Sequence, residues 1–244
     1  MRIIIADDYQ EMSRRAAAMV SSQVILKHDS VLGLATGDTP LGMYKELIKL
    51  YENKEVDFFD VSTFNLDEYY KLSIENKQSY YYYMNHNFFR HINVKKENTH
   101  ILNGMAKDIT AECRNYDQQI KNDGGIDIQV LGIGANGHIG FNEPDVNFEA
   151  ETHLVKLDEM TIEANSRFFS SKDEVPTTAI SMGIKTIMQS RRVILLASGA
   201  GKADAIYKTV NGKICPELPA SILQLHPDAT IIIDKNAGKL LSDD

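Results

Sequence analysis

Short runs of β-branched and other apolar residues alternate along this chain with longer amphipathic segments. That alternation is typical of βα units, in which each helix carries the chain back across a parallel sheet. It predicts an α/β fold with a Rossmann-like open, mostly parallel sheet flanked by helices. The expected strands are Arg2 to Ala6, Val31 to Ala35, Val61 to Leu66, Ile126 to Ile133, Thr178 to Ser181, Val193 to Ala197 and Thr230 to Ile233. The expected helices are Tyr9 to Lys27, Leu41 to Asn53, Gln78 to His91, Ile109 to Asn122, Thr161 to Phe168, Lys202 to Val210 and Lys235 to Leu241.

The length of the chain suits one such domain, which we expect to cover residues 1–244, because no repeat or Pro/Gly/Ser linker divides it. Its formal net charge is −8 with acids and bases interspersed, so no basic stripe is present to bind nucleic acid. No window approaches the roughly 20 apolar residues of a membrane helix. Two cysteines are too few for a disulfide framework. A cytoplasmic protein without a membrane partner is expected, and monomer and homo-oligomer both stay open.

The first candidate site follows the second expected strand and reads Thr36, Gly37, Asp38, Thr39 and Pro40. Backbone amides at the start of the following helix could bind an anion, and the threonine hydroxyls could donate to it. The spacing fits neither a dinucleotide-binding fingerprint nor a P-loop. An ordinary βα turn capped by Thr39 therefore stays an alternative.

Two adjacent carboxylates, Asp67 and Glu68, stand at the end of the third expected strand. Neighbouring side chains on a strand point in opposite directions, so at most one of the two needs to face a crevice. A carboxylate there could accept a carbon-bound proton next to a carbonyl. Either one could instead cap a helix or a turn.

The strongest signal is the glycine-rich stretch that follows the fourth strand, from Gly132 to Pro144. Its four glycines, Gly137 among them, permit sharp turns and close approach of the backbone to a ligand. They surround Asn136, His138 and Glu143, and an imidazole beside a carboxylate is suited to moving protons. Zinc is a poor second interpretation, because the spacing is not H-E-x-x-H and no cysteine is near. We therefore expect no metal and no organic cofactor.

Two cations complete the candidate set. Arg167 stands in the last amphipathic segment before the strand at Thr178, and Lys202 follows the strand that ends at Ala197. Each taken singly is more typical of a solvated surface charge. The stretch from Phe141 to Lys156 has no clear periodicity, and long loops at strand ends are where ligands bind in open α/β sheets, so it is a candidate rim or lid.

With these stretches in view, the chain resembles the glucosamine-6-phosphate deaminase family from Leu32 to about His226. The markers are Leu34 to Pro40, Asn65 to Tyr69, Gly132 to Pro144, Ala164 to Phe169, Ser198 to Lys202 and Leu223 to His226. The resemblance implies conversion of glucosamine 6-phosphate to fructose 6-phosphate and ammonia, an isomerisation with hydrolytic deamination in amino-sugar catabolism. It also implies that no metal or cofactor takes part.

The resemblance further implies a role for each candidate residue. Asp67 would be the base that moves a proton between sugar carbons, and His138, supported by Glu143, would handle ring opening. The sugar phosphate would be held by Thr36, Gly37, Asp38, Thr39, Gly137, Arg167 and Lys202.

Three departures from the family pattern stand out. Asn136 occupies a place where some members carry aspartate, and an amide can orient an imidazole but adds no charge. Asp38 stands where glycine or serine is expected. A carboxylate about 5 Å from a phosphate charge costs roughly 3 kcal/mol at an effective dielectric near 20, so we expect it to point away, bonded to backbone or solvent. The stretch Glu151 to Val155 lacks the basic residues of members activated by N-acetylglucosamine 6-phosphate, which predicts no such activation.

Two other functions stay in view. A 6-phosphogluconolactonase would share the loop at Thr36 and the Gly-His pair, but it does not require Asp67 in an Asp-Glu-Tyr setting. A sugar-phosphate sensor would carry a DNA-binding helix-turn-helix before the domain, whereas this chain begins with an expected strand.

Overall fold

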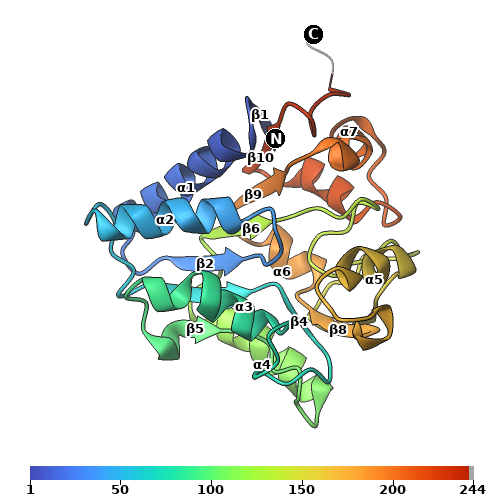
Figure 1. Ribbon diagram of the computed structural model, residues 1–244, viewed down its shortest axis with the longest axis horizontal. Coiled ribbons are helices and arrows are strands. Elements are labelled where there is room, and N and C mark those ends of the chain that lie inside the picture. The colour runs from blue at the N-terminus through green and yellow to red at the C-terminus, as the bar shows by residue number, and fades with distance from the viewer. Residues whose placement is uncertain (242–244) are drawn as a thin grey trace.

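The computed structural model describes residues 1–241, and its centre is a seven-stranded sheet (Figure 1). The strand order is β1-β10-β9-β6-β2-β3-β5, and every neighbouring pair is parallel. The strands are β1 (Arg2–Ala6), β2 (Val31–Leu34), β3 (Ser62–Asn65), β5 (Thr99–His100), β6 (Ile128–Leu131), β9 (Arg192–Ala197) and β10 (Ala229–Asp234). The predicted open, mostly parallel α/β sheet is confirmed.

Helices cover both faces of this sheet, as its buried strands require. One face packs against α1 (Tyr9–Leu26), α2 (Leu41–Glu52) and α3 (Tyr80–Asn87), through a core that includes Met12, Leu47 and Met84. The other face packs against α4 (Ile109–Asn122), α6 (Ile184–Met188), α7 (Ala203–Asn211) and the 3-10 helix η5 (Pro219–Leu225). Successive residues of a strand enter alternate cores, since Val130 belongs to the first and Leu131 to the second.

A second, three-stranded sheet lies beside the first. It consists of β4 (Asp67–Tyr69), β8 (Thr178–Ser181) and β7 (His153–Lys156), all antiparallel in the order β4-β8-β7. The expectation that Thr178 to Ser181 joins the main parallel sheet was therefore wrong. Figure 1 shows β4, β8 and α5 (Glu159–Ser166) together at one side of the molecule.

Several expected helices differ from the structure. The segment 78–91 divides into α3 and the 3-10 helix η1 (Phe89–His91), because Phe88 leaves helical geometry and stacks on the ring of Tyr44 in the core. Residues 235–240 form turns rather than a helix. α5 begins earlier than expected because the Asp158 side chain caps it by accepting from the Met160 amide. The remaining 3-10 turns are η2 (Lys96–Asn98), η3 (Lys172–Glu174) and η4 (Ala200–Lys202), the last of which precedes α7.

The order of the strands creates a crevice between β2 and β6. These two strands are neighbours, but the chain continues from β2 towards β3 on one side and from β6 towards β9 on the other. Ligands bind at such a switch point in open α/β sheets, outside the carboxyl ends of the strands. The loops at residues 36–40 and 132–140 both begin there. Within residues 1–241, no helix is long and apolar enough to cross a membrane.

Candidate active site

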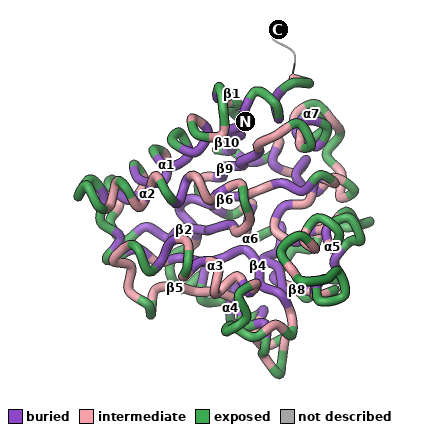
Figure 2. Tube along the Cα trace, viewed as in Figure 1, coloured by how far each residue is buried: buried purple, intermediate pink, exposed green. Residues whose placement is uncertain are grey.

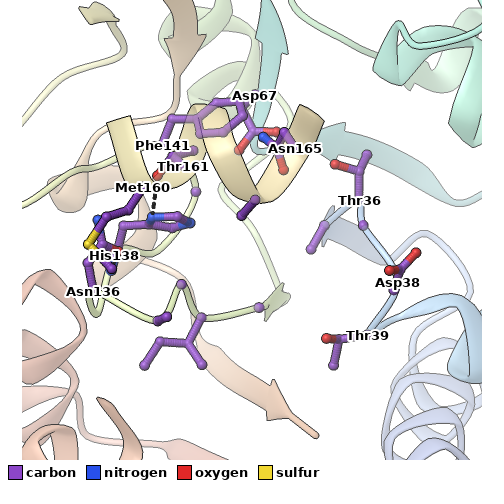
Figure 3. Close-up of a pocket in the computed structure, with 18 of the residues that line it drawn as sticks. Thr36, Asp38, Thr39, Asp67, Asn136, His138, Phe141, Met160, Thr161 and Asn165 are labelled. Carbon is purple, nitrogen blue, oxygen red and sulfur yellow. Dashed lines mark hydrogen bonds between the residues drawn. The ribbon is translucent and has the colours of Figure 1, made fainter. Parts of the chain in front are cut away.

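A cavity of about 700 Å³ opens at this switch point. It lies between the loop after β2, the loop after β6, β4 and α5, and Figure 3 shows Asp67 between Thr36 on one side and His138 on the other. The sequence-predicted residues that line it are Thr36, Gly37, Asp38, Thr39, Asp67, Asn136, His138, Arg167 and Lys202. Residues from five separate stretches of sequence thus meet at one cavity.

The loop after β2 turns its carbonyl groups away from the cavity. Three tyrosine hydroxyls hold them: Tyr44 donates to Ala35 (2.5 Å), Tyr83 to Gly37 (2.5 Å) and Tyr9 to Asp38 (3.0 Å). Gly37 has a φ of 92°, a conformation that favours glycine. None of the amides of residues 36–39 donates to a group within residues 1–241. A turn with unused amides at the start of a helix is suited to binding an oxyanion.

The Asp38 carboxylate forms an ion pair with Arg167, with Oδ2 2.7 Å from the guanidinium. The expectation that it bonds to backbone or solvent was therefore wrong. Both side chains are exposed and lie on opposite sides of the cavity mouth, and an opposite charge within reach outcompetes water there. Thr39 does not cap the following helix, because Pro40 occupies the cap position and no side chain bonds there.

Lys202 is the second cation at this end of the cavity. Its ammonium group has no hydrogen-bond or ion-pair partner among residues 1–241. Burial, and then the charge of Arg167, lowers its pKa. Two cations held close together in this way would be stabilised by a doubly charged anion.

Asp67 presents an unpartnered carboxylate to the cavity. The residue is only 6 % exposed, and its carboxylate accepts no hydrogen bond from residues 1–241. Burial, and then the neighbouring charge of Glu68, raises the pKa of Asp67 to about 8. Gly140 lies in the opposite loop, beside this carboxylate, and its φ of 58° is a conformation that favours glycine. A carboxylate with a raised pKa that has no internal partner is suited to accept a proton from a ligand.

The ring of His138 is held from behind by Glu143. Oε2 of Glu143 lies 3.1 Å from His138 Nδ1 and also accepts from the Asn136 side-chain amide at 2.8 Å. Burial is the largest single influence and raises the pKa of Glu143, but the hydrogen bond and charge of His138, together with hydrogen bonds from Thr161 and Asn136, outweigh it, so the net pKa is lowered. Because an ionised carboxylate only accepts, Nδ1 carries the proton and Nε2 stays open to the cavity. Thr161 also approaches Nδ1, at 3.4 Å (Figure 3).

Gly137 does not line the cavity. Its φ of 88° shapes the turn before His138, and a Cβ there would collide with Leu218. Its amide donates to the Gly134 carbonyl (3.1 Å), and its carbonyl accepts from the Ala220 amide (2.9 Å). In this geometry Gly137 shapes the loop, and its expected contact with a substrate stays a prediction.

Sequence reasoning missed several lining residues, among them Tyr80, Thr161 and Asn165. Of the expected rim from Phe141 to Lys156, only Phe141 reaches the cavity, and α5 supplies the other wall. Figure 2 shows α5 as mostly exposed, in contrast to the buried strands β6 and β9. The Asn165 side chain donates to the Tyr69 hydroxyl at 2.9 Å, so α5 is tied to β4. The repeated tyrosines at residues 80–83 were the available signal.

Within residues 1–241, no group of three or more His, Cys, Asp or Glu side chains is placed to hold a metal ion. Asp67 and His138 lie on different parts of the cavity wall (Figure 3).

Comparison with known proteins matches this arrangement to one family. The profile of glucosamine-6-phosphate isomerases/6-phosphogluconolactonase matches residues 6–232, which include the whole cavity. The chain belongs to this family. A glucosamine-6-phosphate deaminase of Clostridium acetobutylicum is 67 % identical over 241 residues, covering 99 % of this chain and 100 % of that protein. A glucosamine-6-phosphate deaminase of Clostridium botulinum strain Hall is 64 % identical over 242 residues, covering 99 % of each.

Solved structures of the isomerase/lactonase family agree with the fold. A monomeric glucosamine-6-phosphate deaminase of the NagB superfamily superposes with a TM-score of 0.96 at 48 % identity, covering 98 % of this chain and 100 % of that one. The 6-phosphogluconolactonase of Leishmania guyanensis has a TM-score of 0.76 at 20 % identity, covering 99 % of this chain and 98 % of its own. The likeness to the lactonase shows a shared fold only.

Proposed function

We propose that this chain converts glucosamine 6-phosphate to fructose 6-phosphate and ammonia in amino-sugar metabolism. The observation that carries the proposal is the pairing of two proton-transfer groups in one cavity. The unpartnered Asp67 carboxylate lies on one side, and the His138 ring, held by Glu143, lies on another. The deaminases named above, at 64 % and 67 % identity over nearly the whole chain, support the same activity. Because sugar phosphates do not cross membranes unaided, the substrate implies a cytoplasmic enzyme.

The phosphate group binds at the loop after β2. Amides of residues 36–39 and the hydroxyls of Thr36 and Thr39 donate to it, while Lys202 and Arg167 supply charge. To do so Arg167 exchanges Asp38 for the phosphate. An exposed ion pair contributes about 0–1 kcal/mol, so that exchange is easily offset by a dianion.

Ring opening falls to His138. Its Nε2 accepts the proton of the C1 hydroxyl and delivers a proton to the ring oxygen, so the C1–O5 bond breaks and C1 becomes an aldehyde. Glu143 stabilises the ring while it carries the extra proton, and Asn136 keeps Glu143 in place.

Isomerisation falls to Asp67. Its carboxylate takes the proton from C2 while the aldehyde oxygen takes a proton from water, which gives an enolamine. Asp67 then returns the proton to C1, and the lone pair of the amino nitrogen forms the double bond to C2, which gives an iminium ion. Water adds to C2, ammonia leaves, and fructose 6-phosphate remains. Every step is a proton transfer, a hydration or an elimination, so the scheme needs no oxidant, and we propose that the reaction is independent of metal.

The experiment that tests this function measures ammonia and fructose 6-phosphate from purified protein and glucosamine 6-phosphate. Equal amounts of both products are expected, and none from Asp67→Asn. A parallel assay with 6-phosphogluconolactone tests the alternative, whose support is a fold shared at 20 % identity or less. Lactone hydrolysis without ammonia release would overturn the proposal.

A further inference from the structure

Glu68 follows Asp67 on β4 but points away from the cavity. It is completely buried, and its carboxylate accepts from the backbone amides of Tyr69 (2.8 Å), Tyr80 (3.0 Å) and Tyr81 (2.9 Å). Within residues 1–241 no cation contacts it. Gly104 closes over it, since a Cβ at Gly104 would lie 3.4 Å from Glu68 Cγ and 2.1 Å from the Tyr69 carbonyl. Burying a carboxylate without a counter-ion costs free energy, which the three hydrogen bonds from these amides offset in part.

The amides of Tyr80 and Tyr81 belong to the first turn of α3. Ser79 caps the same helix by accepting from the Tyr82 amide at 3.1 Å. Glu68 therefore binds amides that lack partners inside the helix, at the end where the helix dipole favours negative charge. These contacts dock α3 directly onto the strand that carries Asp67.

α3 in turn reaches the cavity at two points. Tyr80 lines it, and its ring packs on that of Tyr69 with centroids 5.0 Å apart. Tyr83 donates its hydroxyl to the Gly37 carbonyl at 2.5 Å, which fixes the loop proposed to bind phosphate. A connected path thus runs from Asp67 through Glu68 and α3 to Gly37.

We propose that Glu68 is a positioning residue that docks α3 on β4 and so holds the phosphate loop at a fixed distance from Asp67. Its charge also makes Asp67 a stronger proton acceptor. This inference rests on the proposed function. The other titratable side chains around the two carboxylates are Tyr69 on β4, Tyr80 on α3 and Tyr116 on α4. Burial raises the pKa of each of these tyrosines, so they stay neutral in the working range. Burial raises the pKa of Glu68 itself to about 7, so above that pH Glu68 is the charge that acts on Asp67 from the buried side.

The test compares Glu68→Gln with wild-type enzyme. Removing the charge should move the acid limb of the kcat/KM profile to lower pH by about one unit. Weaker docking should raise KM about three- to tenfold. It should also speed hydrogen exchange at the Tyr80 and Tyr81 amides. Asp108→Asn is the matched control, because Asp108 caps α4 by accepting from the Ala111 amide but lies outside the site. An unmoved limb, together with a KM no more altered than in Asp108→Asn, would overturn the proposal.

Two further variants separate docking from charge. Tyr83→Phe keeps Glu68, so it should raise KM while leaving the acid limb of the kcat/KM profile in place. In the double variant with Glu68→Gln, the combined effect on KM should be smaller than the sum of the two single effects, expressed as free energies. Glu68→Asp keeps the charge and should hold the limb while KM rises, which keeps the test sharp if Glu68→Gln does not fold. An unchanged KM in both Tyr83→Phe and Glu68→Asp contradicts the docking path. Ammonia release by the wild-type enzyme is measured first, because its absence would refute the proposed function. Hydrogen exchange at the Tyr80 and Tyr81 amides tests the docking of α3 independently of that activity.

Discussion

The carboxylate of Asp38 and the guanidinium of Arg167 form an ion pair 2.7 Å long across the mouth of the cavity. The two residues come from different walls, the loop after β2 and the end of α5. In the proposed complex with substrate, the phosphate replaces this carboxylate on Arg167. The competition is weak, because both side chains are more than half exposed and solvent screens the pair.

Asp38→Gly or Asp38→Asn should therefore lower KM for glucosamine 6-phosphate by no more than about threefold, under 1 kcal/mol. The reason is that Arg167 no longer has to break its ion pair with Asp38 before it binds the phosphate. Steady-state kinetics at low and high salt check this, with the difference between variant and wild type shrinking as salt rises. A tenfold or larger change in KM would show that Asp38 contacts the phosphate itself.

His138→Gln should slow reaction of the cyclic substrate far more than reaction of an analogue that is already open-chain. Glutamine cannot cycle between proton donor and acceptor as the Glu143-held imidazole does. The ratio of kcat/KM values for the two substrates is the measurement. Equal losses on both would assign His138 to a later step.

The acidic pair of β4 makes the folded protein less stable as pH rises. An aspartate in an unfolded chain has a pKa near 3.9, whereas that of folded Asp67 is about 8. Between these values the folded state binds more protons than the unfolded state, so the free energy of unfolding falls with rising pH. Asp67→Asn should be more stable than wild type by about 1–3 kcal/mol at pH 8, with the gain vanishing near pH 4. Denaturant titrations at both pH values check this, and a gain that is the same at both would contradict it.

EDTA should leave the rate of ammonia release unchanged, because the proposed proton transfers, hydration and eliminations assign no step to a metal ion. Dialysis against the chelator, followed by the same assay with and without added divalent ions, provides the measurement. Loss of activity that one ion restores would refute metal independence.

The sequence was informative where the structure follows local periodicity. The short apolar runs of β1, β2, β6, β9 and β10 predict a parallel sheet, and the glycine-rich stretch predicts the loop that carries His138. The strands β4, β5 and β7 were not predicted, because they are short and partly polar. The strand β8 was assigned to the wrong sheet, because its antiparallel partners are remote in sequence. Strand alternation predicted that one of Asp67 and Glu68 faces away, but only the fold shows that Glu68 binds α3.

The electrostatics of the site were less accessible from sequence. Asp38 and Arg167 lie 129 positions apart, so their pairing depends on how α5 packs beside the β2 loop. Likewise, the unpartnered state of Asp67 depends on which amides and hydroxyls the neighbouring elements use for themselves. The sequence motif of Gly137 suggested ligand contact, but only the fold shows that this residue lies against Leu218 and outside the cavity lining.

The central claim is that Asp67 carries the proton from C2 to C1 of glucosamine 6-phosphate. It is tested most directly with substrate deuterated at C2, by following the label and the product with wild-type enzyme and with purified Asp67→Asn. The account predicts fructose 6-phosphate with part of the deuterium at C1 from the wild type. From Asp67→Asn it predicts no product, although substrate still binds. Turnover by Asp67→Asn at the wild-type rate would contradict it.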